Sequence, residues 1–143
     1  MASFVKYQQF VEDLGNAVHD LVGTQHTLKV ALTNTAPNVA THATLSQITE
    51  LAAGSGYTAG GADTQNDGTE SGGTLTVTGV DVTFTASGGS IGPFRYVVLY
   101  NDTPTSPADP LIGYWDYGAS GVTLADGESF TVNFASDILL TIT

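Results

Sequence analysis

Cysteine is absent from the sequence, and basic residues are almost absent. Without cysteine the chain can form neither disulfides nor thiolate metal sites, and a cysteine nucleophile is excluded. Lys and Arg together number 3 among 143 residues, against 14 Asp and Glu, so the formal net charge is −11. Binding to nucleic acid or to an anionic membrane surface depends on basic side chains. We therefore expect no nucleic acid and no membrane among the partners of this chain.

Long apolar stretches are missing as well. No apolar run approaches the length of a membrane span, and the opening MASFVKYQQF lacks the apolar core of a secretory signal. We expect a soluble protein that is made in a cytoplasm. Hydrophobic residues nonetheless make up 41% of the chain, which argues against global disorder. The length suits a single domain covering residues 1–143.

An amphipathic helix is predicted at residues 3–22. Apolar residues recur there at alternating steps of three and four, which places them on one stripe of a helix. They are Phe4, Tyr7, Val11, Leu14, Val18 and Leu21. Ser3 suits the N-cap, and Gly23 suits the residue that follows the helix. We expect this helix to cover one face of a sheet, with an assembly helix of the coiled-coil type as the alternative.

From residue 26 to residue 143 the sequence has the two-residue alternation of β-strands. The segment SFTVNF is the clearest case, with Phe130, Val132 and Phe134 on the inward side. In LTVTGVDVTFTA the apolar positions change from odd to even numbers at Gly79, which predicts a turn or bulge there. The predicted fold class is therefore mainly β, an antiparallel β-sandwich or a jelly-roll-like barrel with one N-terminal α-helix.

Residues 52–74 interrupt this pattern with Gly, Ser, Thr and acidic residues. We predict a long Gly-rich loop, because the segment offers almost nothing to bury. Asp63, Gln65 and Asp67 loosely follow the opening of an EF-hand loop, but the bidentate acid of that loop would fall at Thr74. A solvated acidic loop is the favoured interpretation, and an irregular calcium site that uses Glu70 is the minor alternative.

Catalytic and metal-binding patterns are missing. The three histidines, His19, His26 and His42, are scattered along the chain, whereas zinc sites use clustered ligands. No nucleophile elbow, phosphate-binding loop or dinucleotide fingerprint is present. A glycosidase pair depends on spatial rather than sequence distance, but acids such as Asp116 stand singly among aromatic residues. We predict that the protein is not an enzyme and binds no cofactor and no metal.

Two strands, FRYVVLY at residues 94–100 and LIGYWDYG at residues 111–118, are apolar on both faces. One face fills the core, so the other must be covered by the N-terminal helix or by another subunit. We place Arg95 on this second face, with Asp116 as a candidate carboxylate partner. Because Tyr, Trp and Arg are enriched at protein interfaces, we predict an interface formed by Arg95, Val97, Leu99, Ile112, Tyr114, Trp115 and Asp116. An ion pair inside one chain, under the helix, is an alternative of equal weight.

Several stretches of the sequence carry, in their order, a resemblance to a known family: KVALTNTAP, ITELAAGSGYTAGG, FTASGGSIGPFRYVVLYNDTP, PLIGYWDYG and LADGESFTVNF. They resemble small structural proteins of tailed bacteriophages that are encoded beside the major capsid protein. The resemblance runs over residues 2–143 and contains no catalytic signature. It implies a capsid decoration (cement) protein on the outer surface of the virion, where it binds the major capsid protein and stabilises contacts between capsid subunits. By analogy with other cement proteins, it also implies a homodimer or homotrimer.

Two other functions stay open at this point. The first is a tail, head–tail or fibre-adaptor component of the same virion. The second is a carbohydrate-binding β-sandwich in which Trp115 and Tyr117 form a stacking platform for sugar rings. Locating the protein on the particle separates the first from a head protein, and glycan binding tests the second.

Overall fold

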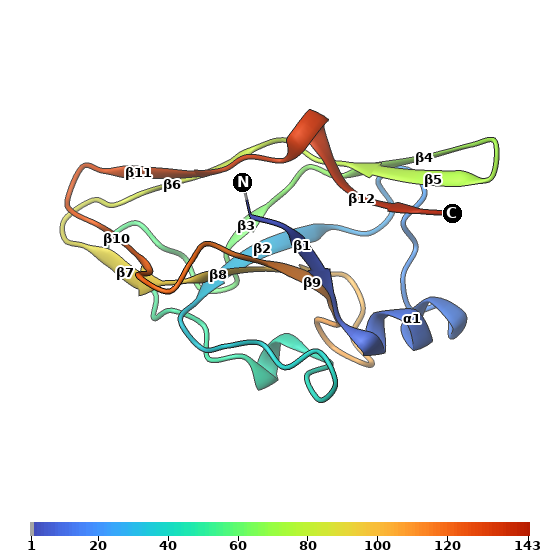
Figure 1. Cartoon of the computed structure of the whole chain (residues 1–143), viewed down its shortest axis with the longest axis horizontal. Helices are drawn as coiled ribbons and strands as arrows, with labels where there is room; N and C mark the ends of the chain where they lie inside the picture. Colours follow the sequence, from blue (N-terminus) through green and yellow to red (C-terminus); the bar gives the residue numbers. More distant parts are fainter. Residues whose placement is uncertain (1) are drawn as a thin grey trace.

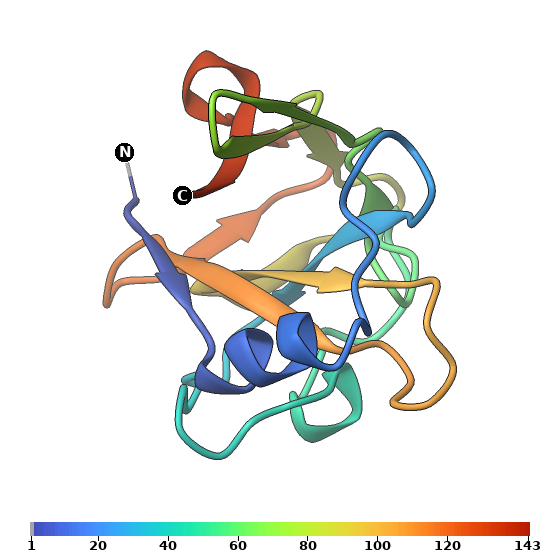
Figure 2. The same cartoon turned by 90° about the vertical axis from the view of Figure 1, so that its right-hand side faces the viewer.

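The computed structural model describes residues 2–143, which form two β layers and one short helix (Figures 1 and 2). One layer is an antiparallel five-stranded sheet in the order β1-β9-β8-β2-β3. Its strands are β1 (Phe4–Lys6), β2 (Leu28–Thr33), β3 (Ala62–Asp63), β8 (Tyr96–Asn101) and β9 (Leu111–Asp116). This sheet holds both of the strands that the sequence marks as apolar on two faces.

The remaining strands form three smaller antiparallel sheets. Two of them lie end to end along the top of Figure 1 as the second layer, and the third, formed by residues 91–94 and 122–124, lies lower at the left. A three-stranded sheet has the order β12-β5-β4, with β4 (Asp67–Ser71), β5 (Thr74–Thr78) and β12 (Ile138–Ile142). Two further pairs are β6 (Val82–Thr85) with β11 (Ser129–Val132), and β7 (Ile91–Phe94) with β10 (Val122–Leu124). The described residues thus confirm a mainly β, antiparallel sandwich with one N-terminal helix, and their sheets do not close into a barrel.

The helix predicted at residues 3–22 is wrong in its bounds, because helix α1 spans only Gln8–Gly15. Residues Phe4–Lys6 form strand β1 instead, and Phe4 pairs with Trp115 of β9. The centroids of these two aromatic rings lie 5.2 Å apart. The apolar spacing of this stretch fits a helix, but pairing with β9 satisfies its backbone and packs the Phe4 ring against Trp115. Tertiary contacts therefore override the local periodicity.

Helix α1 ends early because Ala17 adopts a φ of 57°, in the left-handed region that a right-handed helix excludes. The chain then crosses to β2 through residues 16–27, here called the connecting segment, which contains neither helix nor strand. An isolated bridge between Gly23 and Gly68 ties the segment to β4. A side chain on Gly68 would collide with the backbone of Leu21, so glycine is required for this approach.

The Gly-rich loop predicted at residues 52–74 is only partly a loop. Its second half forms β4, which pairs with β5 in a hairpin whose last register pair is Ser71 with Thr74. The two turn residues, Gly72 and Gly73, have φ values of 61° and 86°. Positive φ at both central residues is the requirement of the tight hairpin turns that match strand twist. The strand was missed because its residues are small and polar and β4 has little apolar surface to bury.

A β-bulge in β9 divides its side chains between two apolar clusters. Leu99 of β8 pairs with Gly113, whereas Tyr100 pairs with Leu111, so Ile112 is the extra residue. Strict alternation along LIGYWDYG would place Ile112 and Tyr114 on one face, and the bulge separates them. Ile112 and Trp115 belong to the main core between the layers, and Leu111 and Tyr114 face the other way.

The second face of the five-stranded sheet is covered within the same chain. The side chains there form a cluster, here called the helix-side cluster, of Tyr7, Ala31, Ile48, Val98, Tyr100 and Leu111, all of them buried. Tyr7 immediately precedes α1, and Ile48 follows the short 3-10 turn Leu45–Gln47. The sequence left open whether the N-terminal helix or another subunit covers this face, and the structure shows that segments of the same chain cover it.

Candidate interaction surface

Arg95 and Asp116 form the ion pair that the sequence suggested. Arg95 Nε donates to Asp116 Oδ1 and Arg95 Nη2 donates to Oδ2, both at 2.8 Å, in a bidentate arrangement. The amide of Gly118 also donates to Oδ1. These hydrogen bonds lower the pKa of Asp116 to about 2, and those from Arg95 have the larger effect. The pair is about one-third exposed, so it is neither a buried core pair nor a free charge.

The position of Arg95 differs from the prediction, because the residue lies in the break between β7 and β8 and not inside a central strand. Its amide donates to the carbonyl of Thr33, and its own carbonyl accepts from the amide of Tyr117. The guanidinium carbon lies 5.0 Å from the centroid of the Tyr96 ring. The ion pair therefore closes one end of the five-stranded sheet by linking the residue before β8 to the last residue of β9.

Most of the predicted interface residues are buried and cannot contact another molecule. The exposed fraction is 0% for Val97, Leu99 and Ile112, because all three point into the main core. Trp115 is 8% exposed and packs against Phe4 and Phe134. The interface prediction is therefore wrong for the apolar residues of β8 and β9.

Tyr114 is the remaining aromatic residue of the predicted interface. It is half-buried, and its ring centroid lies 5.7 Å from that of Tyr7 and 5.9 Å from that of Tyr96. Only part of Tyr114 and part of the Arg95–Asp116 pair reach the surface. This small polar and aromatic area is all that remains of the predicted site.

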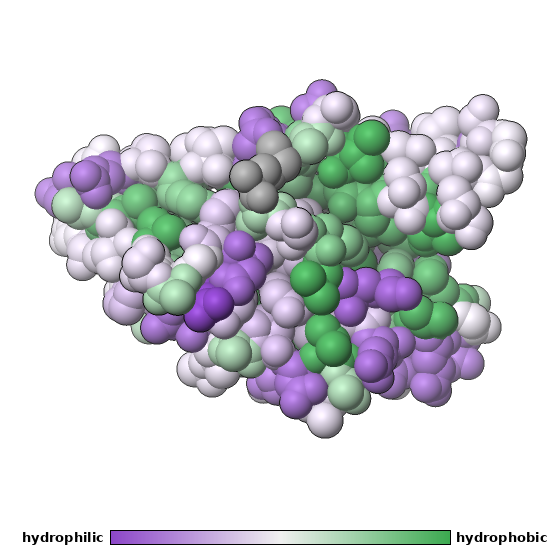
Figure 3. All heavy atoms as spheres, viewed as in Figure 1, coloured by the Kyte–Doolittle hydropathy of each residue, from purple (hydrophilic) through white to green (hydrophobic). Residues whose placement is uncertain are grey.

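An apolar groove that the sequence did not predict lies between α1, β1 and β12. It has a volume of about 320 Å³ and is lined by Phe4, Lys6, Phe10, Val11, Leu14, Leu140, Thr141, Ile142 and Thr143. Figure 3 shows apolar residues gathered on this face, in a hollow between the upper layer and α1. The missed signal is the helical stripe of α1, whose Val11 and Leu14 face this groove instead of a closed core.

One of the groove's lining residues, Val11 of α1, is 52% exposed. The other large apolar side chains that are exposed among residues 2–143 do not line it: Val5, Val22, Val80 and Ile138. Lys6 also lines the groove, and within residues 2–143 it forms no ion pair, whereas Lys29 and Arg95 both do. No acidic residue belongs to the lining of this groove, although the chain has 14 Asp and Glu. The groove is therefore an apolar site without acidic side chains in its lining, on a strongly acidic molecule.

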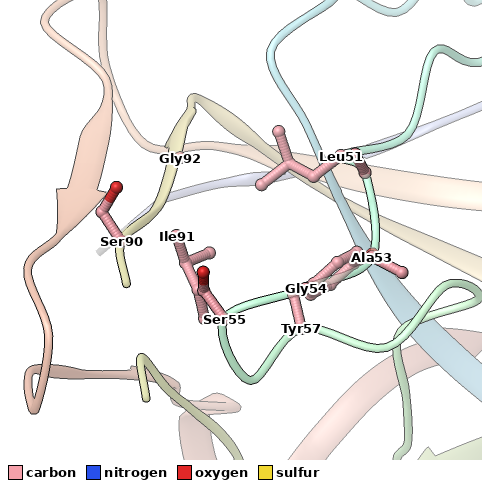
Figure 4. Close-up of a pocket in the computed structure, with 9 residues that line it drawn as sticks. Leu51, Ala53, Gly54, Ser55, Tyr57, Ser90, Ile91 and Gly92 are labelled. Atoms are coloured by element: carbon pink, nitrogen blue, oxygen red, sulfur yellow. The ribbon is translucent and has the colours of Figure 1, made fainter. Parts of the chain in front are cut away.

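A second depression, of about 220 Å³, lies between residues 51–57 and the start of β7 (Figure 4). Tyr57 is its one titratable lining residue, and the phenol already donates to Glu50 and accepts from the amide of Leu32. Burial, and then the hydrogen bond to Glu50, raise the pKa of Tyr57 far above its ordinary value. Ser55 and Ser90 have no base beside them in the lining. The lining of this depression therefore offers hydroxyl groups but no base to activate them as nucleophiles.

The residues considered for calcium do not converge. Asp63 accepts the amide of Gln65, and Glu70 accepts the amide of Gly73, as turn residues do. Within residues 2–143 no three His, Asp or Glu side chains are grouped so that they could hold a metal ion. Over the same residues, no helix has the length and apolar character needed to cross a membrane.

Two of the three histidines, predicted to be scattered, lie together. The side-chain nitrogen of Asn101 lies 3.0 Å from Nδ1 of His19 and 2.9 Å from Nδ1 of His26. The sequence gives no signal of this, because Asn101 is more than seventy positions from either histidine. His42 lies elsewhere and accepts the amide of Asn38.

Comparison with known proteins adds no relative. No family model, no curated protein and no solved structure matches this chain.

Proposed function

We propose that this chain is a virion structural protein that decorates the outside of a tailed-phage head and stabilises contacts between major capsid protein subunits. The observation that carries the proposal is the apolar groove between α1, β1 and β12. The second face of the five-stranded sheet is covered inside the chain, whereas Val11 in the lining of this groove is 52% exposed. Exposed apolar patches of this kind are typical of protein contact sites. The resemblance to phage structural proteins supplies the partner.

Charge supports the same assignment. A net charge of −11 repels packaged DNA, so the chain suits the outer surface of a shell. The groove itself has no acidic lining residue and includes Lys6, which is free to meet a carboxylate of the partner. We therefore propose that the groove is the surface that contacts the capsid. We also propose self-association, as a homodimer or homotrimer, which the mass in solution tests.

The carbohydrate-binding alternative has no support from the aromatic residues on which it depended. Trp115 is 8% exposed and lies against Phe4 and Phe134. Tyr117 is half-buried and packs edge-on against Phe130, with 5.0 Å between the ring centroids. A flat, exposed platform for sugar stacking does not form from these two side chains.

The experiment is binding to heads that were assembled without this chain, measured by co-sedimentation. Wild-type protein is expected to bind, and Val11→Asp is expected to weaken binding by about tenfold or more, because a carboxylate would be desolvated in the groove. Val22→Asp is the matched control, since Val22 is 57% exposed and lies outside the groove. Binding confined to tails would favour the tail alternative. Equal effects of the two substitutions would contradict the groove as the contact.

A further inference from the structure

The end of strand β8 holds two histidines through one amide. Asn101 is fully buried, and its side-chain nitrogen lies 3.0 Å from Nδ1 of His19 and 2.9 Å from Nδ1 of His26. The amide of Thr103 donates to the side-chain oxygen of Asn101, which fixes which end of the side chain is nitrogen. A carboxamide nitrogen has two hydrogens to donate and accepts none. Both imidazoles must therefore accept at Nδ1.

Acceptance at Nδ1 fixes the protonation state of both rings. An imidazole that accepts at one nitrogen is neutral and carries its proton on the other, so His19 and His26 are both Nε2–H tautomers. His26 Nδ1 also accepts the backbone amide of Asp20 at 3.2 Å. A proton added to Nδ1 of either ring would face the N–H groups that now donate to it. The arrangement is compatible with neutral histidines only.

The charged groups around this pair come from three directions. Asp13 of α1 places Oδ2 4.0 Å from Nε2 of His19, and both atoms are buried without a hydrogen-bond partner. Asp20 precedes His26 in the connecting segment, and Asp63 of β3 lines the same shallow depression as His26. Strand β8 contributes the uncharged Asn101.

Burial determines whether the His19 ring is neutral or charged. Its side chain has no exposed surface, and the ring of Phe10 packs against it edge-on at 5.1 Å between centroids. Burial lowers the pKa of His19 to about 4, against the opposing attraction of Asp13 and with a smaller contribution from His26. The neutral ring is therefore the form that this site accommodates at neutral pH.

We propose that Asn101, His19 and His26 form a proton-sensitive clamp that fixes the connecting segment (residues 16–27) and the end of α1 against β8. With both imidazoles neutral, the clamp is closed. Protonation of either ring at Nδ1 places its new N–H group opposite the N–H group of Asn101, so the hydrogen bond is lost and the connecting segment is released. Because α1 contributes Phe10, Val11 and Leu14 to the apolar groove, acid release also loosens one wall of that groove. The clamp itself does not depend on the proposed function, since it is a property of the isolated chain.

The first test is the tautomeric state of the wild-type histidines, measured by long-range ¹⁵N NMR at pH 7.5. The clamp requires Nδ1 of His19 and of His26 to be unprotonated. A protonated Nδ1 in either ring overturns it. The second measurement is amide exchange at pH 7.5 and pH 5, corrected for intrinsic rates. The amide of Asp20, which donates to His26, and that of Val18, which donates to Asp13 O, should lose protection by about tenfold or more at pH 5.

A substitution reverses the sign of the effect. Asn101→Asp has nearly the same shape but offers two acceptors, so it should bind protonated imidazoles, raise the pKa of His19 and protect the segment better at pH 5 than at pH 7.5. His42→Gln is the control, because His42 lies outside the cluster, and it should leave the wild-type response unchanged. The same pH response in Asn101→Asp as in wild type would overturn the clamp. If that variant does not fold, the wild-type tautomer measurement still decides the matter.

Discussion

Gly113 of β9 lies directly under the ring of Phe4 of β1, so close that a methyl group on Gly113 would occupy the position of the ring. This contact lets β1 pair with β9 at the edge of the five-stranded sheet and places Phe4 at the junction of the main core and the apolar groove. The groove therefore depends on the absence of a single side chain in the strand beside it.

Gly113→Ala is expected to displace β1 and to lower the free energy of unfolding by about 1–3 kcal/mol, as overpacking does. Urea denaturation measures the change. Gly15→Ala is the matched control, because Gly15 ends α1 with no atom within 4 Å of the position of an added Cβ. That control should be neutral or stabilising by up to about 1 kcal/mol. Equal stability of the two variants would show that the contact between β1 and β9 is loose.

The pKa of Asp116 is expected to depend on Arg95. In wild type the carboxyl should titrate near pH 2, because the guanidinium and the Gly118 amide hydrogen-bond to its charged form. Its contribution to stability is present above the ordinary pKa of an aspartate and is lost as the pH falls through the lowered value. In Arg95→Gln the pKa should return toward its ordinary value. Titration of the Asp116 carboxyl ¹³C signal by NMR measures this pKa in wild type and in the variant. A titration unchanged by Arg95→Gln would contradict the bidentate pair.

The stability of the chain is expected to fall between about pH 6.5 and pH 4 because of His19. The lowered folded-state pKa of about 4 means that the unfolded chain binds more protons than the folded chain in this window. Stability from this group is complete above the window and lost below it, at a cost of about 3 kcal/mol. Urea denaturation across this range should show the slope in wild type and a flatter profile in His19→Gln. A wild-type profile without that slope would contradict the burial of a neutral His19.

The β4–β5 turn should accept only residues that tolerate positive φ. Gly72 has a φ of 61° and no atom near the position of an added Cβ, so backbone conformation alone limits substitution. Gly72→Asn should cost less than about 1 kcal/mol, whereas Gly72→Val should cost about 1–2 kcal/mol more than that. Thermal unfolding of both variants measures the difference. A valine that is as stable as the asparagine would show that the turn has another conformation.

Alternation of polar and apolar residues predicted the strands well where one face is buried. Val132 and Phe134 point inward as the pattern of SFTVNF indicates, and the change of parity near Gly79 marks the end of β5. The pairing of Arg95 with Asp116 could also be predicted from the sequence, because few other charged residues occur in or near these two strands. These features depend on local pattern and on charge scarcity, both of which the sequence contains.

Other features depend on contacts between distant segments. The stretch around Phe4 fits a helix by spacing, and only pairing with β9 makes it a strand. The bulge at Ile112 moves Trp115 into the main core, although alternation alone puts those two residues on opposite faces. The groove and the Asn101 cluster arise where three separate elements meet. The periodicity of a single segment contains no information about contacts between distant segments, so neither the groove nor the Asn101 cluster was predicted.

The central claim is that the apolar groove between α1, β1 and β12 docks this chain on the outer surface of a phage head. The most direct measurement is a reconstruction of the intact particle, by electron cryo-microscopy, at a resolution that shows side chains. The account predicts density for this fold on the outside of the capsid, with Val11 and Lys6 against the major capsid protein. Density found only on the tail, or a decorating subunit whose groove faces solvent, would contradict it.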